Sequence, residues 1–466
     1  MPTFGGLLSI ARSGLMASQA QISTASQNVT NAQTPGYSRQ RVTLVQGYPE
    51  QLPQGTFGTG VMVKNVERMR DELLDSAYRR DSGAAAYSEE RRDALQAVED
   101  ILGEPSSSGL ASGLDQFWSA WSDLSTNPDS GAARGVVRQR GAQIAAQLNT
   151  FGNQIEDART VARTQLLVTA DRVNALSSQV ADINARIVAA EAAGTQSPDL
   201  RDQRDSKVDE LSKLIGATAY RQANGAVNIN VGGDSIVDGA NFKPVRIQAP
   251  PSDPTKLGVA LGALPAGGSP TETMYQLGGE MAGRIDAYNS VYPDALAELD
   301  TIASAIVTET NSRHRTGFVG NAAAGDFFDA SRTTARTMRL DSAIAANAGR
   351  IAASGIAGES GDNSLALIMA QMRDTAVSVN GQTVSLNEGY RNVVAGIATR
   401  VNSANGTAAA VRTLASSTDA RRESIKGVSI DEEMVNLMKY QQSYAAAARL
   451  ISVVDEMSQT LINLGR

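Results

Sequence analysis

The chain has 466 residues and a formal net charge of −7 at pH 7, and only 5% of its residues are aromatic. An acidic chain of this kind lacks the basic face that nucleic acid requires. The absence of cysteine and the single histidine, His314, exclude disulfides, thiolate metal sites and most histidine-based catalysis. The composition therefore favours closely packed helices of small side chains over an enzyme core.

The first predicted helix runs from Leu7 to about Asn28. It carries a seven-residue repeat, and such a repeat predicts a seam that packs against a partner helix, as in a left-handed coiled coil. The residues of the repeat are Phe4, Leu8, Ala11, Leu15, Ser18, Ile22, Ala25 and Val29. Asn31 is predicted to cap the C-terminus of this helix, and Pro35-Gly36 with Tyr37 predicts a turn.

The segment from Tyr37 to Val66 is predicted to form an extended loop and a β-hairpin. Helical patterns resume near Asn65 and occupy residues 65–102, 110–124, 131–192 and 199–215. At 1.5 Å per residue, the longest of these helices would extend about 80–90 Å. A compact globule does not need that length, so the pattern predicts a rod.

Carboxylates recur along the helix predicted at 199–215, with basic residues three or four positions away. This spacing predicts a solvated helix face rather than a metal site. The residues are Asp199, Asp202, Asp205, Asp209 and Glu210, with Arg201, Arg204 and Lys207. No phosphate-loop, dinucleotide or metalloprotease spacing is present either. We therefore predict no cofactor, no metal ligand and no catalytic residue, and place His314 at a helix C-terminus.

From Ala217 to Gln248 the apolar period changes to two, with turn signals such as Asn224-Gly225. A Pro- and Gly-rich stretch, 250–270, closes this β insert. Helices are then predicted at 279–315, 364–377 and 386–425.

The final helix is predicted to begin near Asp431, with Ser429 as its N-cap and Glu432 at the third helical position. Its apolar repeat comprises Ala447, Leu450, Val454, Met457, Leu461 and Leu464. Isolated helices are marginally stable in water, so both terminal helices need partners. We therefore predict assembly with copies or neighbours; an ordinary helix pair that closes a globular bundle is the alternative.

Both ends of the chain resemble one protein family. The N-terminal stretch SGLMASQAQISTASQNVTNAQTPGYSRQRV begins at Ser13, and the C-terminal stretch VSIDEEMVNLMKYQQSYAAAARLISVVDEMSQTLINL begins at Val428. Both resemble the bacterial flagellar axial proteins, which comprise rod, hook and hook-associated proteins. The internal stretches 197–216, 277–302 and 311–331 follow in the same order. TPGYSRQRV, with Pro35 and Ser38, is more similar to hook-associated members than to rod and hook members.

The resemblance implies a mainly α fold with a β insert: an elongated multi-domain rod of long helices, with paired terminal helices and a small β-rich outer domain. The implied domains are an inner (axial) domain, 1–64 plus 428–466, a long-helix rod, 65–216 plus 274–427, and a β-rich outer insert, 217–273. The implied function is structural: a junction between hook and filament that assembles by coiled-coil-like packing of the terminal helices. The alternatives are another axial protein, such as hook or distal rod, or an exported cell-wall enzyme with axial ends.

The resemblance also assigns residues to this function. The expected assembly residues are Leu8, Leu15, Ile22, Val29, Leu450, Val454, Met457, Leu461 and Leu464. Asn31, Pro35, Gly36 and Tyr37 would set the turn that leaves the inner tube. An export chaperone would cover Met434, Leu437, Met438, Tyr440, Tyr444, Leu450 and Ile451, which are otherwise an aggregation hazard.

Partners and location follow from the same resemblance. The partners would be copies of the chain and other axial proteins, namely hook protein and hook-associated protein 3, with neither nucleic acid nor membrane. The chain would leave the cytoplasm through the flagellar type III export apparatus and lie extracellularly, at the hook–filament junction. The N-terminal residues lack a basic region followed by an apolar one, so no cleaved signal peptide is expected.

Overall fold

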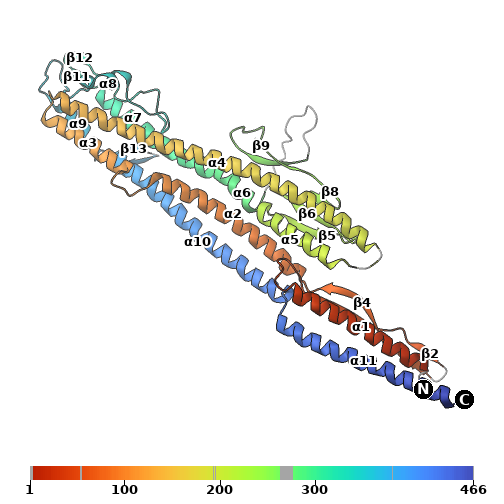
Figure 1. Ribbon diagram of the computed structural model, residues 1–466. Helices are drawn as coiled ribbons and strands as arrows, with labels where there is room; N and C mark the ends of the chain where they lie inside the picture. Colours follow the sequence, from red (N-terminus) through yellow and green to blue (C-terminus); the bar gives the residue numbers. More distant parts are fainter. Residues whose placement is uncertain are drawn as a thin grey trace.

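The computed structural model describes residues 4–52, 55–192, 194, 196–262, 277–379 and 381–464; the side chains of Phe4, Leu52 and Leu464 lie outside this description. The molecule is elongated, with long helices side by side and both termini at one end (Figure 1). The expected class, a mainly α rod with a β insert, is confirmed. Among the described residues, no helix is both long and apolar enough to cross a bilayer.

The end that holds the termini is built from two helices and a β-ribbon. Helix α1 (Phe4–Thr30) lies antiparallel to α11 (Ile430–Leu464) (Figure 1). Strand β1 (Gln40–Gln46) pairs with β4 (Val61–Arg68) against α1, and β2 (Glu50–Leu52) pairs with β3 (Gly55–Phe57).

The rod begins later than its helical pattern predicted. Helix α2 (Glu72–Leu102) starts at Glu72 rather than near Asn65, because the preceding residues pair in β4. The carboxylate of Asp71 accepts hydrogen bonds from the backbone N–H groups of Leu73 and Leu74, which fixes the helix start.

Long helices make up the rest of the rod. Helix α10 (Leu386–Lys426) runs beside α2, and α4 (Gly131–Glu191) packs against α3 (Leu110–Thr126), α5 (Pro198–Ile215) and α6 (Gly279–Asp286) (Figure 1). With 61 residues, α4 extends about 90 Å. Short elements complete the far end: β11 (Phe318–Val319), β12 (Ala322–Ala323), α8 (Ser342–Ala346), a 3-10 turn (Ala348–Arg350) and α9 (Ser364–Gln371).

Two predicted helices are shorter or less regular than expected. The helix expected at 279–315 contains a π-helical turn (Ala287–Val291) between α6 and α7 (Tyr292–His314), because Pro293 has no N–H to donate. The helix expected at 364–377 ends at Gln371. Val377–Val379 alternates between buried and exposed residues and forms β13, which pairs with β14 (Gln382–Val384).

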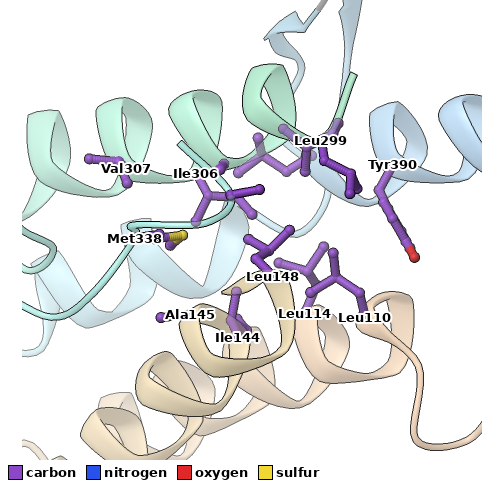
Figure 2. Packing of buried hydrophobic residues seen from close by; sticks show 14 of the residues in the cluster. Leu110, Leu114, Ile144, Ala145, Leu148, Leu299, Ile306, Val307, Met338 and Tyr390 are labelled. Atoms are coloured by element: carbon purple, nitrogen blue, oxygen red, sulfur yellow. The ribbon is translucent and has the colours of Figure 1, made fainter. Parts of the chain in front are cut away.

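The largest core lies at the end of the rod away from the termini. Its side chains come from α3, α4, α7 and α10. Figure 2 shows Leu110, Leu114, Ile144, Leu148, Leu299, Ile306 and Tyr390 in this core. Both tryptophans, Trp118 and Trp121, are buried here beside Phe117.

His314 is also buried in this core. It ends α7, as expected, but its ring is fully covered: Nδ1 donates to the Gly325 carbonyl at 2.7 Å, and Nε2 accepts from the Ala352 N–H at 3.1 Å. These two bonds require the neutral ring with its proton on Nδ1.

The β insert forms a small sheet on α4 and α5. Strands β5 (Thr218–Arg221), β6 (Val227–Val231), β7 (Asp234–Asp238) and β8 (Asn241–Phe242) pair in chain order. Strand β9 (Val245–Gln248) pairs with β10 (Gly258–Leu261), a strand inside the stretch that was expected only to close the insert. The sheet shares one apolar core with α4 and α5, so it is packed on the rod.

Candidate assembly surface

The two terminal helices meet through small side chains. On α1 the buried residues include Ala11, Ser18 and Ala25, and on α11 they include Ala447. A Cβ added at Gly14 would lie 3.8 Å from the Ala447 Cβ, so the two backbones run close together. Most of the larger apolar side chains of both helices remain exposed or only half-buried.

Most predicted assembly residues are exposed or half-buried in the helix pair. Leu8, Leu450, Met457 and Leu461 are exposed, and Leu15, Ile22 and Val29 are half-buried. The side chain of Leu464 lies outside the described residues. Val454 differs from these residues: it is only 4% exposed and packs inside the chain's own helix pair, as Ala447 does seven residues earlier.

The predicted chaperone-contacting residues divide in the same way. Met434, Met438, Tyr444 and Leu450 are exposed, and Leu437, Tyr440 and Ile451 are half-buried. Further exposed apolar residues lie on these helices outside the predicted sets: Met16, Val435, Val453 and Ile462. Val453 stands between Leu450 and Met457 at steps of three and four, which was the signal that could have identified it.

The predicted turn directs the chain from α1 toward the rod. The Asn31 N–H still bonds to the Gln27 carbonyl, and Gly36 adopts a left-handed φ of +82°, which favours glycine. The Tyr37 hydroxyl donates to the Asn28 Oδ1 at 2.9 Å. Pro35 completes the turn, which brings the next residues onto α5.

Asn28 connects three parts of the terminal domain and was missed as a functional residue. Its Oδ1 also accepts from the Gln40 N–H at 2.9 Å, and its Nδ2 donates to the Gln40 carbonyl and to Glu433 Oε2. Asn28 precedes Val29 and lies outside the predicted heptad repeat, so the repeat gave no signal for it.

The expectation of a solvated face on α5 is wrong. Asp202, Asp205, Arg201 and Arg204 are buried. Arg68 from β4 bonds to Asp202 at 2.7 Å and to Asp205 at 2.9 Å. Asp209 contacts Arg79 and Arg422, Asp199 accepts from Gln40, and Glu210 pairs with Arg172 at the surface. The partners come from distant segments, so spacing within α5 could not indicate them.

The charges around Asp205 favour its ionised form. Burial alone would raise the pKa of Asp205, but the guanidinium groups of Arg68 and Arg70 outweigh that effect and hold the pKa well below its usual range. The buried ion pairs on α5 therefore hold parts of the chain together. In the described part of the chain, no group of three or more acidic or histidine side chains could hold a metal ion.

Comparisons with known proteins agree with this architecture. Residues 95–328 match the model of the flagellar hook-associated protein FlgK helical domain. Residues 8–37 match the flagella basal body rod protein model, and residues 424–464 match the C-terminal model of the flagellar basal body rod FlgEFG proteins. The terminal matches therefore coincide with α1 and α11.

Two relatives that match over nearly the whole chain share one name, flagellar hook-associated protein 1. Flagellar hook-associated protein 1 of Bacillus subtilis is 31% identical, over 99% of this chain and 98% of its own. That of Escherichia coli is 23% identical, over 98% and 99%. In fold, the chain is similar to the flagellar hook junction protein FlgK from Burkholderia pseudomallei, with a TM-score of 0.65, 16% identity and coverage of 76% of this chain and 100% of that one. The chain belongs to the flagellar hook-associated protein 1 family, a family of structural axial components of the bacterial flagellum and not of enzymes.

Proposed function

We propose that this chain forms the junction between hook and filament by packing the exposed apolar residues of α1 and α11 against neighbouring axial subunits. One observation carries the proposal: the helix pair closes through small residues and leaves Leu8, Leu450, Met457 and Leu461 in water. Complete burial of a Leu or Met side chain contributes about 1.5–3 kcal/mol, so each half-exposed residue that a neighbour covers adds roughly 1 kcal/mol.

The neighbours in this proposal are copies of the chain, hook protein on one side and hook-associated protein 3 on the other. The inner domain, 1–64 plus 428–466, lies along the axis, the rod, 65–216 plus 274–427, surrounds it, and the insert, 217–273, faces outward. The last boundary falls outside the described residues. The packing of α1 on α11 supports a separate inner domain, whereas the sheet of the insert shares a core with α4 and α5 of the rod.

Before assembly, the proposal places the chain in the flagellar type III export pathway without a cleaved signal peptide, and then outside the cell. A cytoplasmic chaperone covers the exposed face of α11 at residues such as Met434, Met438 and Leu450. Leu450 is in both predicted sets, so chaperone binding and assembly would exclude each other. The role is structural, without catalysis.

Leu461→Asp tests the proposal. Leu461 is 59% exposed, so the change leaves the isolated chain folded but places a charge in the intersubunit contact. Expressed in cells that lack the native copy, this variant should be exported but should build no filaments. Leu414→Asp, on α10 at 53% exposure, is the matched control and should support normal filaments.

Electron microscopy of hooks and filaments is the readout. Cells without any copy are expected to make hooks of normal length that bear no filament, which separates a junction protein from a hook or distal rod protein. Normal filaments with Leu461→Asp would contradict the proposed packing.

A further inference from the structure

Two short links connect the terminal-helix pair to the rod. They are residues 69–71, between β4 and α2, and residues 427–429, between α10 and α11 (Figure 1). Neither link has regular secondary structure. Links of this kind leave the angle between two bodies free unless other contacts fix it.

Several hydrogen bonds span this joint next to the predicted turn. The Ser38 N–H and hydroxyl donate to the two carboxylate oxygens of Asp202 on α5, at 2.9 and 2.6 Å. The Arg39 N–H donates to the Lys426 carbonyl at the end of α10, at 2.8 Å. Ser38 is fully buried and Asp202 nearly so, and water therefore competes little with these bonds.

Ion pairs continue from Asp202 into the rod and back to α11. Arg68 bridges Asp202 and Asp205, and Arg70 bridges Asp205 and Asp75, with N–O distances of 2.7–3.1 Å. On the other side of the joint, Arg39 pairs with Glu432 and Glu433 on α11. One connected network at the joint therefore comprises Ser38, Arg68, Arg70, Asp75, Asp202 and Asp205.

Buried ion pairs of this kind specify geometry more than they add stability. The cost of removing two charges from water roughly cancels their attraction, whereas removing one partner strands a buried charge. The contacts are directional and satisfied in one arrangement, so any other angle between the two bodies would break them.

We propose that Asp202 is a positioning residue that fixes the angle between the terminal-helix pair and the rod. The inference deepens the proposed function, because a helical array can form only if each subunit presents its terminal and rod surfaces at one angle. The turn at residues 35–37 then acts to place Ser38 on α5, in addition to ending α1.

The absence of cysteine allows a direct test in the full-length chain. Ala189→Cys near the end of α4 and Ser443→Cys on α11, both exposed, carry a pair of spin labels across the joint. Pulsed electron paramagnetic resonance then measures the distance distribution. The labelled parent should give one narrow peak, and Asp202→Ala should lose it and give a broad distribution.

Three further variants make the result specific. Asp182→Ala, on an exposed part of α4, is the matched control and should keep the narrow peak. Ser38→Ala removes only the hydroxyl bond and strands no charge, so it should broaden the peak even if Asp202→Ala fails to fold. Asp202→Asn keeps an acceptor for Ser38 and should partly restore the narrow peak.

Each outcome decides the inference separately from the proposed function. A broad distribution in the parent, or a narrow one in both Asp202→Ala and Ser38→Ala, would overturn it. So would normal filaments from a variant whose distribution is broad. None of these results changes the interpretation of the Leu461→Asp experiment, which tests the packing surface itself.

Discussion

At the scale of single residues, Asn28 shows how one amide holds the terminal domain together. Its oxygen accepts two hydrogen bonds, from Tyr37 and Gln40, and its nitrogen donates two, to Gln40 and Glu433. A primary amide offers two donors and about two acceptor sites, so the full capacity of the group is used inside the protein. No other side chain of that size matches this pattern.

Asn28→Asp should therefore loosen the pairing of α1 and α11. The change loses both donated bonds and places a carboxylate beside Glu433, at a cost of about 2–4 kcal/mol. Limited proteolysis of the purified chain, with mass spectrometry of the fragments, should show faster loss of residues 1–60 and 427–466. Asn405→Asp, exposed on α10, should be cut at the parent's rate. Equal rates for the two variants would contradict the assigned role.

His314 predicts a dependence of stability on pH. Burial lowers the pKa of His314 below its usual value of 6.5, although the bond to Gly325 and the charges of Asp326 and Asp341 oppose the shift. Below about pH 6.5 the unfolded chain therefore binds a proton that the native chain does not, and stability falls as the pH falls. Each pH unit costs up to about 1.4 kcal/mol until the native pKa is reached.

Urea unfolding followed by tryptophan fluorescence measures this effect, because Trp121 makes a T-shaped ring contact with His314 in the same core. His314→Gln keeps a donor and an acceptor but does not titrate. It should unfold with a flatter pH dependence between about pH 5 and 6.5. Identical slopes for the variant and the parent would exclude His314 as the source.

At this scale, the ion-pair partners of the α5 carboxylates could not be predicted from the sequence. Basic residues recur among the carboxylates of this helix, so a solvated face was the simplest interpretation. In the structure Asp205 does contact Arg204, but Asp202 and Asp205 also bond to Arg68 and Arg70, which stand 134–137 positions away. Only the tertiary fold brings those charges together, and no local pattern encodes it.

At the scale of elements, glycine sets how closely the rod helices approach. A Cβ at Gly283 on α6 would lie 2.6 Å from the Glu90 Cβ and 2.9 Å from the Tyr87 carbonyl oxygen on α2. A Cβ at Gly83 on α2 would lie 2.9 Å from the Ser212 carbonyl oxygen on α5. The obstructing atoms include backbone, so the helices themselves would have to move apart.

Gly283→Ala should accordingly destabilise the rod by about 1–3 kcal/mol, even though alanine is the better helix former. Gly396→Ala on α10 is the opposite case: no described atom outside its own helix and neighbours lies within 4 Å of the added Cβ. That variant should be stabilised by up to about 1 kcal/mol. Thermal unfolding by circular dichroism compares the two, and shifts in the same direction would refute this account.

The heptad repeats predicted both terminal helices but not which face meets the partner. Small residues such as Ala11 and large ones such as Leu15 alternate in the same repeat, and both are compatible with a helical seam. The structure closes the pair through the small residues because two helices approach most closely there. Close packing of the small residues gains dispersion energy within the pair, and most of the large side chains stay partly exposed to contact other partners.

At the scale of the whole molecule, the β insert and the rod helices α4 and α5 form one folding unit. Val173, Leu176 and Val180 of α4 and Val208 of α5 share a core with Ile229 and Val237 of the sheet. Asn184 and Asn174 of α4 also bond to backbone groups of the insert. The sheet covers apolar side chains of α4, so the stability of the rod should depend on the sheet.

Deletion of residues 217–277 tests this dependence. Gly216 and Gly278 are in contact, since a Cβ on Gly216 would lie 2.6 Å from the Gly278 Cα, so the cut ends can be joined without strain. The deletion should nevertheless cause aggregation, because it exposes several apolar side chains worth about 1.5–3 kcal/mol each. Size-exclusion chromatography and urea unfolding are the measurements. A monomer that unfolds like the parent would show the insert to be independent.

The pairing of α1 with α11 also imposes an order in time. Asn28 and Glu433, which bond in that pair, are 405 positions apart. Closing so long a loop in an unfolded chain is slow, whereas a finished rod, with α2 lying along α10, holds both ends next to each other in advance. We therefore expect the terminal pair to form last, after the rod has folded.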